Sequence, residues 1–117
     1  MKLIIAAPPG ERRFSALLRA IHASGLKSSE VTEVVTDGTH PLAGMWATAV
    51  GLPLKRIESK PEVHGEYAAK ARNVSMCVYA DAILALGAER SRNVNHMIQT
   101  AQRMGLRIMA HPIAGGG

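Results

Sequence analysis

The residues best suited to chemistry are glycines and arginines that follow apolar, strand-like segments. Gly10 and Arg12 come after the apolar run of residues 2–7, and Gly87 and Arg92 come after a later apolar run. Glycine lets a backbone approach a ligand closely, and an arginine guanidinium can bind a phosphate through two parallel hydrogen bonds. Residues 37–40 add polar side chains after another β-type run. These residue types favour the binding of an anion.

The segments expected after these runs are helices, and their first turns add to the same preference. Helix starts are expected near Arg12, Pro41 and Arg92, where free N–H groups and the positive end of the helix dipole attract anions. Arg90 and Arg92 are candidates for phosphate contacts, and Arg92 is expected to hold a phosphate together with the N–H groups of its own helix. The candidate ligand-binding residues of these loops are Pro9, Gly10, Arg12, Asp37, Gly38, Thr39, His40, Gly87, Ser91, Arg92 and Asn93. His40 has a second interpretation, as an exposed capping residue.

The chain alternates between strand and helix patterns. Strands are expected at residues 2–7, 31–36, 54–57, 81–86 and 106–110, and helices at 12–24, 42–50, 67–79 and around 94–101 before Gly105. Residues 59–65 are polar, contain Pro61 and are expected to form a connecting loop.

Such an alternation predicts a three-layer, Rossmann-like α/β fold. Right-handed crossovers give a parallel sheet of five strands in the expected order 3-2-1-4-5, with helices on both faces. Ligands of such sheets bind beyond the carboxyl ends of the strands, where the strand order reverses. The sequence therefore predicts a site between the loops after the first and fourth strands, with residues 37–40 beside it.

Length and composition narrow the class of protein. The 117 residues suit one domain, expected at residues 1–114, with a flexible glycine tail at 115–117. Apolar runs are too short to span a bilayer, so no membrane partner is expected. The single cysteine, Cys77, fits a reducing, cytoplasmic environment and is expected in the core. Trp46 is expected to pack inside the protein or at an interface.

The charge of the chain favours an anionic partner. The formal net charge is +5. Lys55, Arg56 and Lys60 form the densest basic group and are expected to be a solvated loop rather than a nucleic-acid patch. Aromatic platforms for base stacking are scarce. Nucleic acid therefore remains a possible partner that is not favoured, and a small anionic molecule is preferred.

No motif points to a metal or a tightly bound cofactor. The chain has neither a Gly-rich loop ending in Lys-Ser or Lys-Thr nor a G-x-G-x-x-G sequence. The remaining histidines show no ligand spacing; they are His22, His64, His96 and His111. No metal site and no cofactor are expected.

Several segments together resemble a known family. Residues 2–7, 34–38 and 51–56, the stretch 68–76 leading into 79–82, and Ser91-Arg92 followed by Met97-Ile98 are similar to the small YAcAr-like branch of the SLOG superfamily. The resemblance implies a Rossmann-like domain that binds nucleotides or nucleotide derivatives. The superfamily also holds lysine-decarboxylase-like phosphoribohydrolases and DNA-processing protein A. Arg72 and Asn73 match the family pattern, which implies ligand contact for them, although one of the two can instead brace the fold.

The chain also departs from that family. Ala7-Pro8-Pro9 stands where the family has Gly-Ser-Arg, the loop at residues 37–40 is shorter, and Asn93-Val94 replaces Gly-Thr. Met97 falls where the phosphoribohydrolases carry their catalytic glutamate, and a thioether cannot transfer protons. No catalytic residue is therefore assigned, and whether the chain is an enzyme stays open.

The expected function is that of a small-molecule binding domain for a nucleotide or nucleotide derivative, acting as a sensor or a sequestering protein. A phosphoribohydrolase-like enzyme is the first alternative, and a nucleic-acid-binding protein is the second. A small domain of this kind can also form a homodimer.

Overall fold

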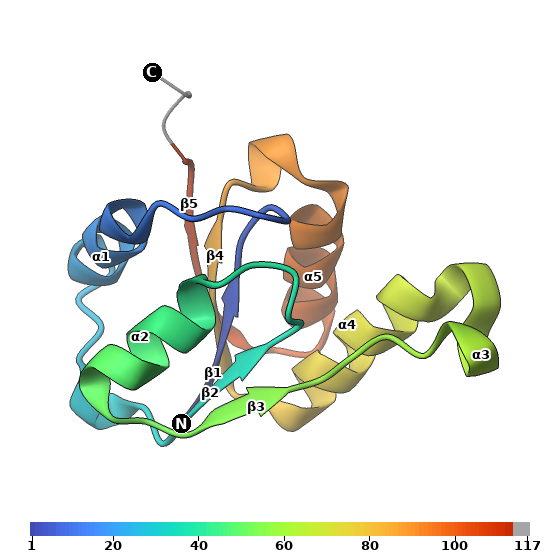
Figure 1. Cartoon of the computed structure of the whole chain (residues 1–117), viewed down its shortest axis with the longest axis horizontal. Coiled ribbons are helices and arrows are strands. Elements are labelled where there is room, and N and C mark those ends of the chain that lie inside the picture. Colours follow the sequence, from blue (N-terminus) through green and yellow to red (C-terminus); the bar gives the residue numbers. More distant parts are fainter. Residues whose placement is uncertain (114–117) are drawn as a thin grey trace.

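The computed structural model describes residues 1–113, and the expected tail at residues 115–117 lies outside them. The sheet has five parallel strands in the order β3-β2-β1-β4-β5, which confirms the fold class expected from the sequence (Figure 1). The strands are β1 (Lys2–Ala6), β2 (Glu33–Thr36), β3 (Leu54–Arg56), β4 (Ala82–Leu86) and β5 (Arg107–His111). Pairing on both sides of β1 places Leu3 opposite Val34 and Ala82.

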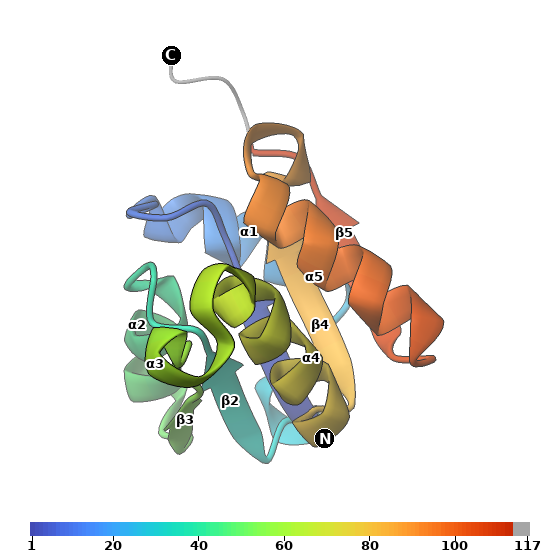
Figure 2. The ribbon, with the colours of Figure 1, turned by 90° about the vertical axis from the view of Figure 1, so that its right-hand side faces the viewer.

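Helices cover both faces of this sheet. The α-helices are α1 (Phe14–Ala23), α2 (Leu42–Val50), α3 (Pro61–His64), α4 (Ala68–Tyr79) and α5 (Arg92–Arg103). Three short 3-10 turns, η1 (Ser28–Glu30), η2 (Gly65–Tyr67) and η3 (Ala88–Arg90), complete the connections. Figure 1 places α1 and α2 on one side of the strands and α4 and α5 on the other. Figure 2 shows α4 and α5 in front of the strands.

The alternation of side chains along β1 divides the core between the two faces. Leu3 and Ile5 pack with Leu17 of α1 and Trp46 of α2. Ile4 and Ala6 pack on the opposite face, in a cluster with residues of α4 and α5. Every residue of β4 is buried, as expected for a central strand covered on both faces.

The core positions of Cys77 and Trp46 are confirmed. Cys77 lies on α4 with 2% exposure, and burial raises the pKa of its thiol to about 11. Trp46 is 3% exposed. None of the helices in residues 1–113 is both long and apolar enough to cross a membrane.

The prediction of a plain connecting loop at residues 59–65 is wrong. Pro61 starts the short helix α3, where its missing N–H and fixed φ suit a first helical position. In the sequence, Pro61 stands in a polar segment and has the appearance of a loop signal, so this helical role is not predicted from it. Figure 1 shows α3 projecting beyond the edge of the sheet, with α4 leading back to it.

Candidate functional site

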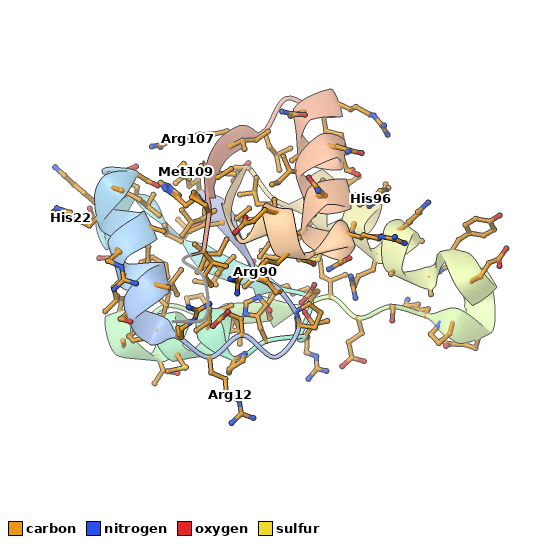
Figure 3. All side chains as sticks on the ribbon, turned by 90° about the horizontal axis from the view of Figure 1, so that it is seen from above. Arg12, His22, Arg90, His96, Arg107 and Met109 are labelled. Carbon is orange, nitrogen blue, oxygen red and sulfur yellow. The ribbon has the colours of Figure 1, made fainter. Side chains whose placement is uncertain are left out.

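The carboxyl edge of the sheet carries a hollow of about 630 Å³. It lies between the loops after β1 and β2 and the start of α2. Its lining residues are Gly10, Arg12, Gly38, Thr39, His40, Pro41 and Met45. Figure 3 looks onto this end of the molecule and shows Arg12 extending outward from it (Figure 3). Five of the thirteen candidate residues from the sequence therefore line one hollow.

The backbone holds the two loops together at the hollow. The N–H of Gly10 donates to the carbonyl of Thr39 at 2.9 Å. Gly10 has φ +77° and Gly38 has φ +79°, conformations that side-chain-bearing residues rarely adopt. The two glycines thus shape the walls of the hollow through backbone geometry.

The positive charge at the hollow comes from Arg12. Arg12 is exposed, and its guanidinium forms no ion pair within residues 1–113. The neighbouring carboxylate of Glu11 is held by Arg13 at 3.1 Å, and hydrogen bonds from Arg13 lower the pKa of Glu11 to about 2. The Glu11 carboxylate is therefore paired with Arg13, and Arg12 has no ion pair in the described residues.

His40 is a buried cap. Its Nε2 donates to the carbonyl of Ile5 at 3.1 Å, and its Nδ1 accepts from the N–H of Leu42 at 3.2 Å. Burial lowers the pKa of His40, so the neutral ring is favoured. The capping interpretation is confirmed, but the expected exposure is wrong because the residue is only 6% exposed. Both ring nitrogens are committed to the backbone, so His40 shapes the hollow.

Asp37 follows β2 and supports the hollow from behind. Its Oδ1 accepts from the N–H of Thr39 at 2.9 Å and from the Thr39 hydroxyl at 2.7 Å. Its Oδ2 accepts from the side-chain amide of Asn93 at 3.2 Å and faces Arg72 Nη2 at 3.6 Å. The side chain is 2% exposed. This carboxylate therefore joins the turn after β2 to helices α4 and α5.

Arg72 and Asn73 belong to the same buried network. Arg72 donates from Nε and Nη2 to Asn73 Oδ1 at 3.3 and 3.1 Å, and from Nη2 to Asn93 Oδ1 at 2.7 Å. Asn73 Nδ2 donates to Asn93 Oδ1 at 2.9 Å and to His96 Nδ1 at 3.1 Å. Burial lowers the pKa of His96, which keeps Nδ1 available as an acceptor. Although adjacent helical residues point about 100° apart, both side chains brace α4 against α5.

The space between the loops after β1 and β4 is packed. Gly87 has φ +69°, and a Cβ there would lie 2.9 Å from Pro8 and 3.0 Å from Ile113. The N–H of Ile113 also donates to Glu89 Oε1 at 2.8 Å. The hollow therefore lies at the expected edge of the sheet, between the loops after β1 and β2. Between the loops after β1 and β4, where the sequence places the site, Pro8 and Ile113 pack closely against Gly87.

The remaining candidates lie around the start of α5 or on the rim. Ser91 Oγ accepts from the N–H of Val94 at 3.2 Å and so caps α5. Arg92 and Arg90 are exposed there and do not line the hollow, and Pro9 is exposed beside Gly10. Figure 3 shows Arg90 inward of Arg12 in this view.

Arg56 is a neighbour of the candidate site that was not predicted from the sequence. A Cβ on Gly38 would overlap the Arg56 guanidinium, with Cζ at 2.7 Å, so Arg56 lies directly over the Gly38 backbone. The signal was present, because Arg56 ends β3 and pairs in register with Thr36, just before Asp37. Met45 was also missed; it faces the hollow from α2.

The position expected for a catalytic acid lies inside the protein. Met97 is completely buried and packs with Ile4 and Met76 under the sheet. Residues 1–113 contain no group of three or more His, Cys, Asp or Glu side chains placed to hold a metal ion. The arrangement at the hollow suits binding of an anion by the Arg12 guanidinium, because the N–H groups of Gly10, Gly38 and Thr39 already donate within the protein.

Comparison with models of known protein families found no match for this chain, and comparison with curated proteins found no relative.

Proposed function

We propose that this chain is a binding domain for a nucleotide or a nucleotide-derived anion, held in the hollow at the carboxyl edge of the sheet. One observation carries the proposal. The hollow combines two glycine-shaped loops, an arginine without an ion-pair partner in residues 1–113, and the side chain of Met45. A nucleotide offers a phosphate for Arg12 and a flat base for the apolar side chain.

The role that we propose is that of a sensor or sequestering protein in the cytoplasm. Such a role requires that the ligand is bound, and it does not require that the ligand is converted. No described residue stands out as a general acid or base at the hollow, since His40 is held on both nitrogens by the backbone. The net charge of +5 suits an anion of any size. We favour a small anion over a nucleic acid, because the chain has few aromatic side chains on which bases could stack. We also propose that the chain is a member of the SLOG superfamily, and this part of the proposal rests on the sequence motifs.

Calorimetric titration with nucleoside mono-, di- and cyclic phosphates tests the proposal. Hydrogen bonds to charged groups contribute about 1.5–3 kcal/mol, so Arg12→Ala should weaken binding about tenfold to a hundredfold. Arg12 is exposed, and its loss should change the free energy of unfolding by less than about 0.5 kcal/mol. Arg103→Ala is the matched control, because it removes the same charge from the last residue of α5.

Absence of binding to every nucleotide at millimolar concentration contradicts the proposal. Equal weakening by Arg12→Ala and Arg103→Ala also contradicts it, because the effect would then follow net charge alone. Arg92→Ala tests the original expectation for the start of α5: a tenfold or greater loss there, with Arg12→Ala unchanged, moves the ligand away from the hollow. Recovery of chemically intact ligand after long incubation supports binding without turnover, and cleavage favours the hydrolase.

A further inference from the structure

A smaller cleft lies between the connection from β3 to α3 and the side of α4. Its volume is about 210 Å³, and it shares no lining residue with the hollow. The lining residues are Ile57, Glu58, Lys60, His64, Arg72 and Ser75. Arg72 and Ser75 are one helical turn apart on α4 and therefore share a face.

Arg72 brings a partly used guanidinium to this cleft. Its Nε and Nη2 atoms are engaged by Asn73, Asn93 and Asp37, and the side chain is only 7% exposed. Nη1 has no hydrogen-bond partner within residues 1–113. Among the described residues, every side-chain nitrogen or oxygen that is fully buried has a hydrogen-bond partner. Because Nη1 has none, it must keep some solvent-accessible surface. Arg72 also lines the cleft.

The charges around the cleft favour an anion. Lys60 is exposed and forms no ion pair in the described part of the chain. Glu58 is the carboxylate among the lining residues, and it is paired with Arg56 at 3.0 Å. The Asp37 carboxylate compensates the charge of Arg72, with Oδ2 at 3.6 Å from Nη2. The ammonium of Lys60 therefore leaves the cleft with a surplus positive charge.

We propose that this cleft binds a phosphate monoester group, independently of the hollow. Arg72 Nη1 and the Ser75 hydroxyl donate hydrogen bonds to its oxygens, and Lys60 supplies the opposing charge. A tetrahedral phosphate has several acceptor oxygens, which suits donors arriving from α4 and from the β3–α3 connection. A buried, pre-oriented arginine also loses little conformational freedom on binding.

The test is an NMR titration of ¹⁵N-labelled protein with inorganic phosphate and with glycerol 2-phosphate at constant ionic strength. We expect saturable shifts of the amide signals of Lys60, His64 and Ser75. Lys60→Ala and Ser75→Ala should each raise the dissociation constant about threefold to thirtyfold. Lys70→Ala is the matched control, because Lys70 is exposed on α4 and does not line the cleft. These substitutions leave the buried Arg72 in place, so the folded state should persist.

The outcomes separate this proposal from the one for the hollow. Shifts confined to Gly10 and Thr39, or no saturable shift, overturn the cleft and leave the hollow to be judged by its own titration. Equal weakening by Lys60→Ala and Lys70→Ala also overturns it. Saturation by acetate as strong as that by phosphate overturns the preference for a phosphate. Shifts at the cleft with no nucleotide binding at the hollow would refute the proposed function and support the cleft.

Discussion

Replacing Asp37 with alanine should destabilise this protein more than any loss of a surface charge. The substitution removes an acceptor of three hydrogen bonds and the carboxylate that faces Arg72 Nη2 at 3.6 Å. Arg72, with its side chain 7% exposed, would keep its charge without the nearby carboxylate. Uncompensated burial of a charge is costly because little water can reach it.

The magnitude follows from burial. Breaking a buried ion pair by removing one partner costs about 3–5 kcal/mol. Domains of this size are stable by about 5–15 kcal/mol, so the variant should lose a large part of its stability. Near the size of this chain, about 1 kcal/mol corresponds to about 4 °C, which predicts a fall in Tm of roughly 12–20 °C.

Urea unfolding followed by circular dichroism measures this loss, and Glu58→Ala is the control. Glu58 pairs with Arg56 at 3.0 Å, which is shorter than the Asp37–Arg72 distance, but the Glu58 side chain is 65% exposed. Surface pairs contribute only about 0–1 kcal/mol, so this control should change little. Similar losses in the two variants would refute the argument that burial, rather than distance, sets the energy.

Three further perturbations have defined outcomes. Gly38→Ala should cost about 1–2 kcal/mol for its left-handed backbone, and more than Gly51→Ala in the melting curves, because a new Cβ at Gly38 meets Arg56 while Gly51, at φ +73°, has open space; equal losses would remove Arg56 from its place over Gly38. Cys77, whose pKa is raised to about 11 by burial, should resist a thiol reagent at pH 8 until urea unfolds the chain, and rapid labelling of native protein would contradict its core position. Burial lowers the pKa of His40 from its usual 6.5, so the contribution of the neutral ring to stability is complete above about pH 6.5 and is lost as the pH falls through the folded-state pKa. The free energy of unfolding should therefore differ less between pH 7.5 and pH 5 in His40→Gln than in the unaltered protein, and an equal difference in the two proteins would contradict this role.

The sequence was sufficient for the fold because its periodicity reports which residues enter the core. Side chains alternate between the two faces of β1, with Leu3 and Ile5 on one face and Ile4 and Ala6 on the other. This alternation can be read from neighbouring residues in the sequence alone. The short helix α3 was missed because Pro61 at a first helical position and a proline in a loop look alike in sequence.

The candidate site was harder because its details depend on contacts between distant segments. Gly87 signals an open loop in sequence, but Pro8 and Ile113 occupy the space beside it, and the chain positions of these residues give no sign of that packing. The motif-based pair Arg72 and Asn73 came with no indication that Asn93 would join them across two helices. Polar networks of this kind are specified by three-dimensional proximity, which periodicity does not encode.

Asp37 links the hollow and the cleft, so its loss separates support from direct contact. One carboxylate oxygen holds Thr39 in the wall of the hollow, and the other faces the Arg72 guanidinium that reaches the cleft. Asp37→Ala should therefore weaken binding of the proposed ligands at both sites. Arg12→Ala should weaken binding only at the hollow, and Lys60→Ala should weaken binding only at the cleft. The three variants are compared at temperatures where Asp37→Ala is still folded. Weaker binding at both sites in Asp37→Ala would then show that Asp37 positions Thr39 and Arg72 and does not contact the ligands, because a carboxylate repels both anions.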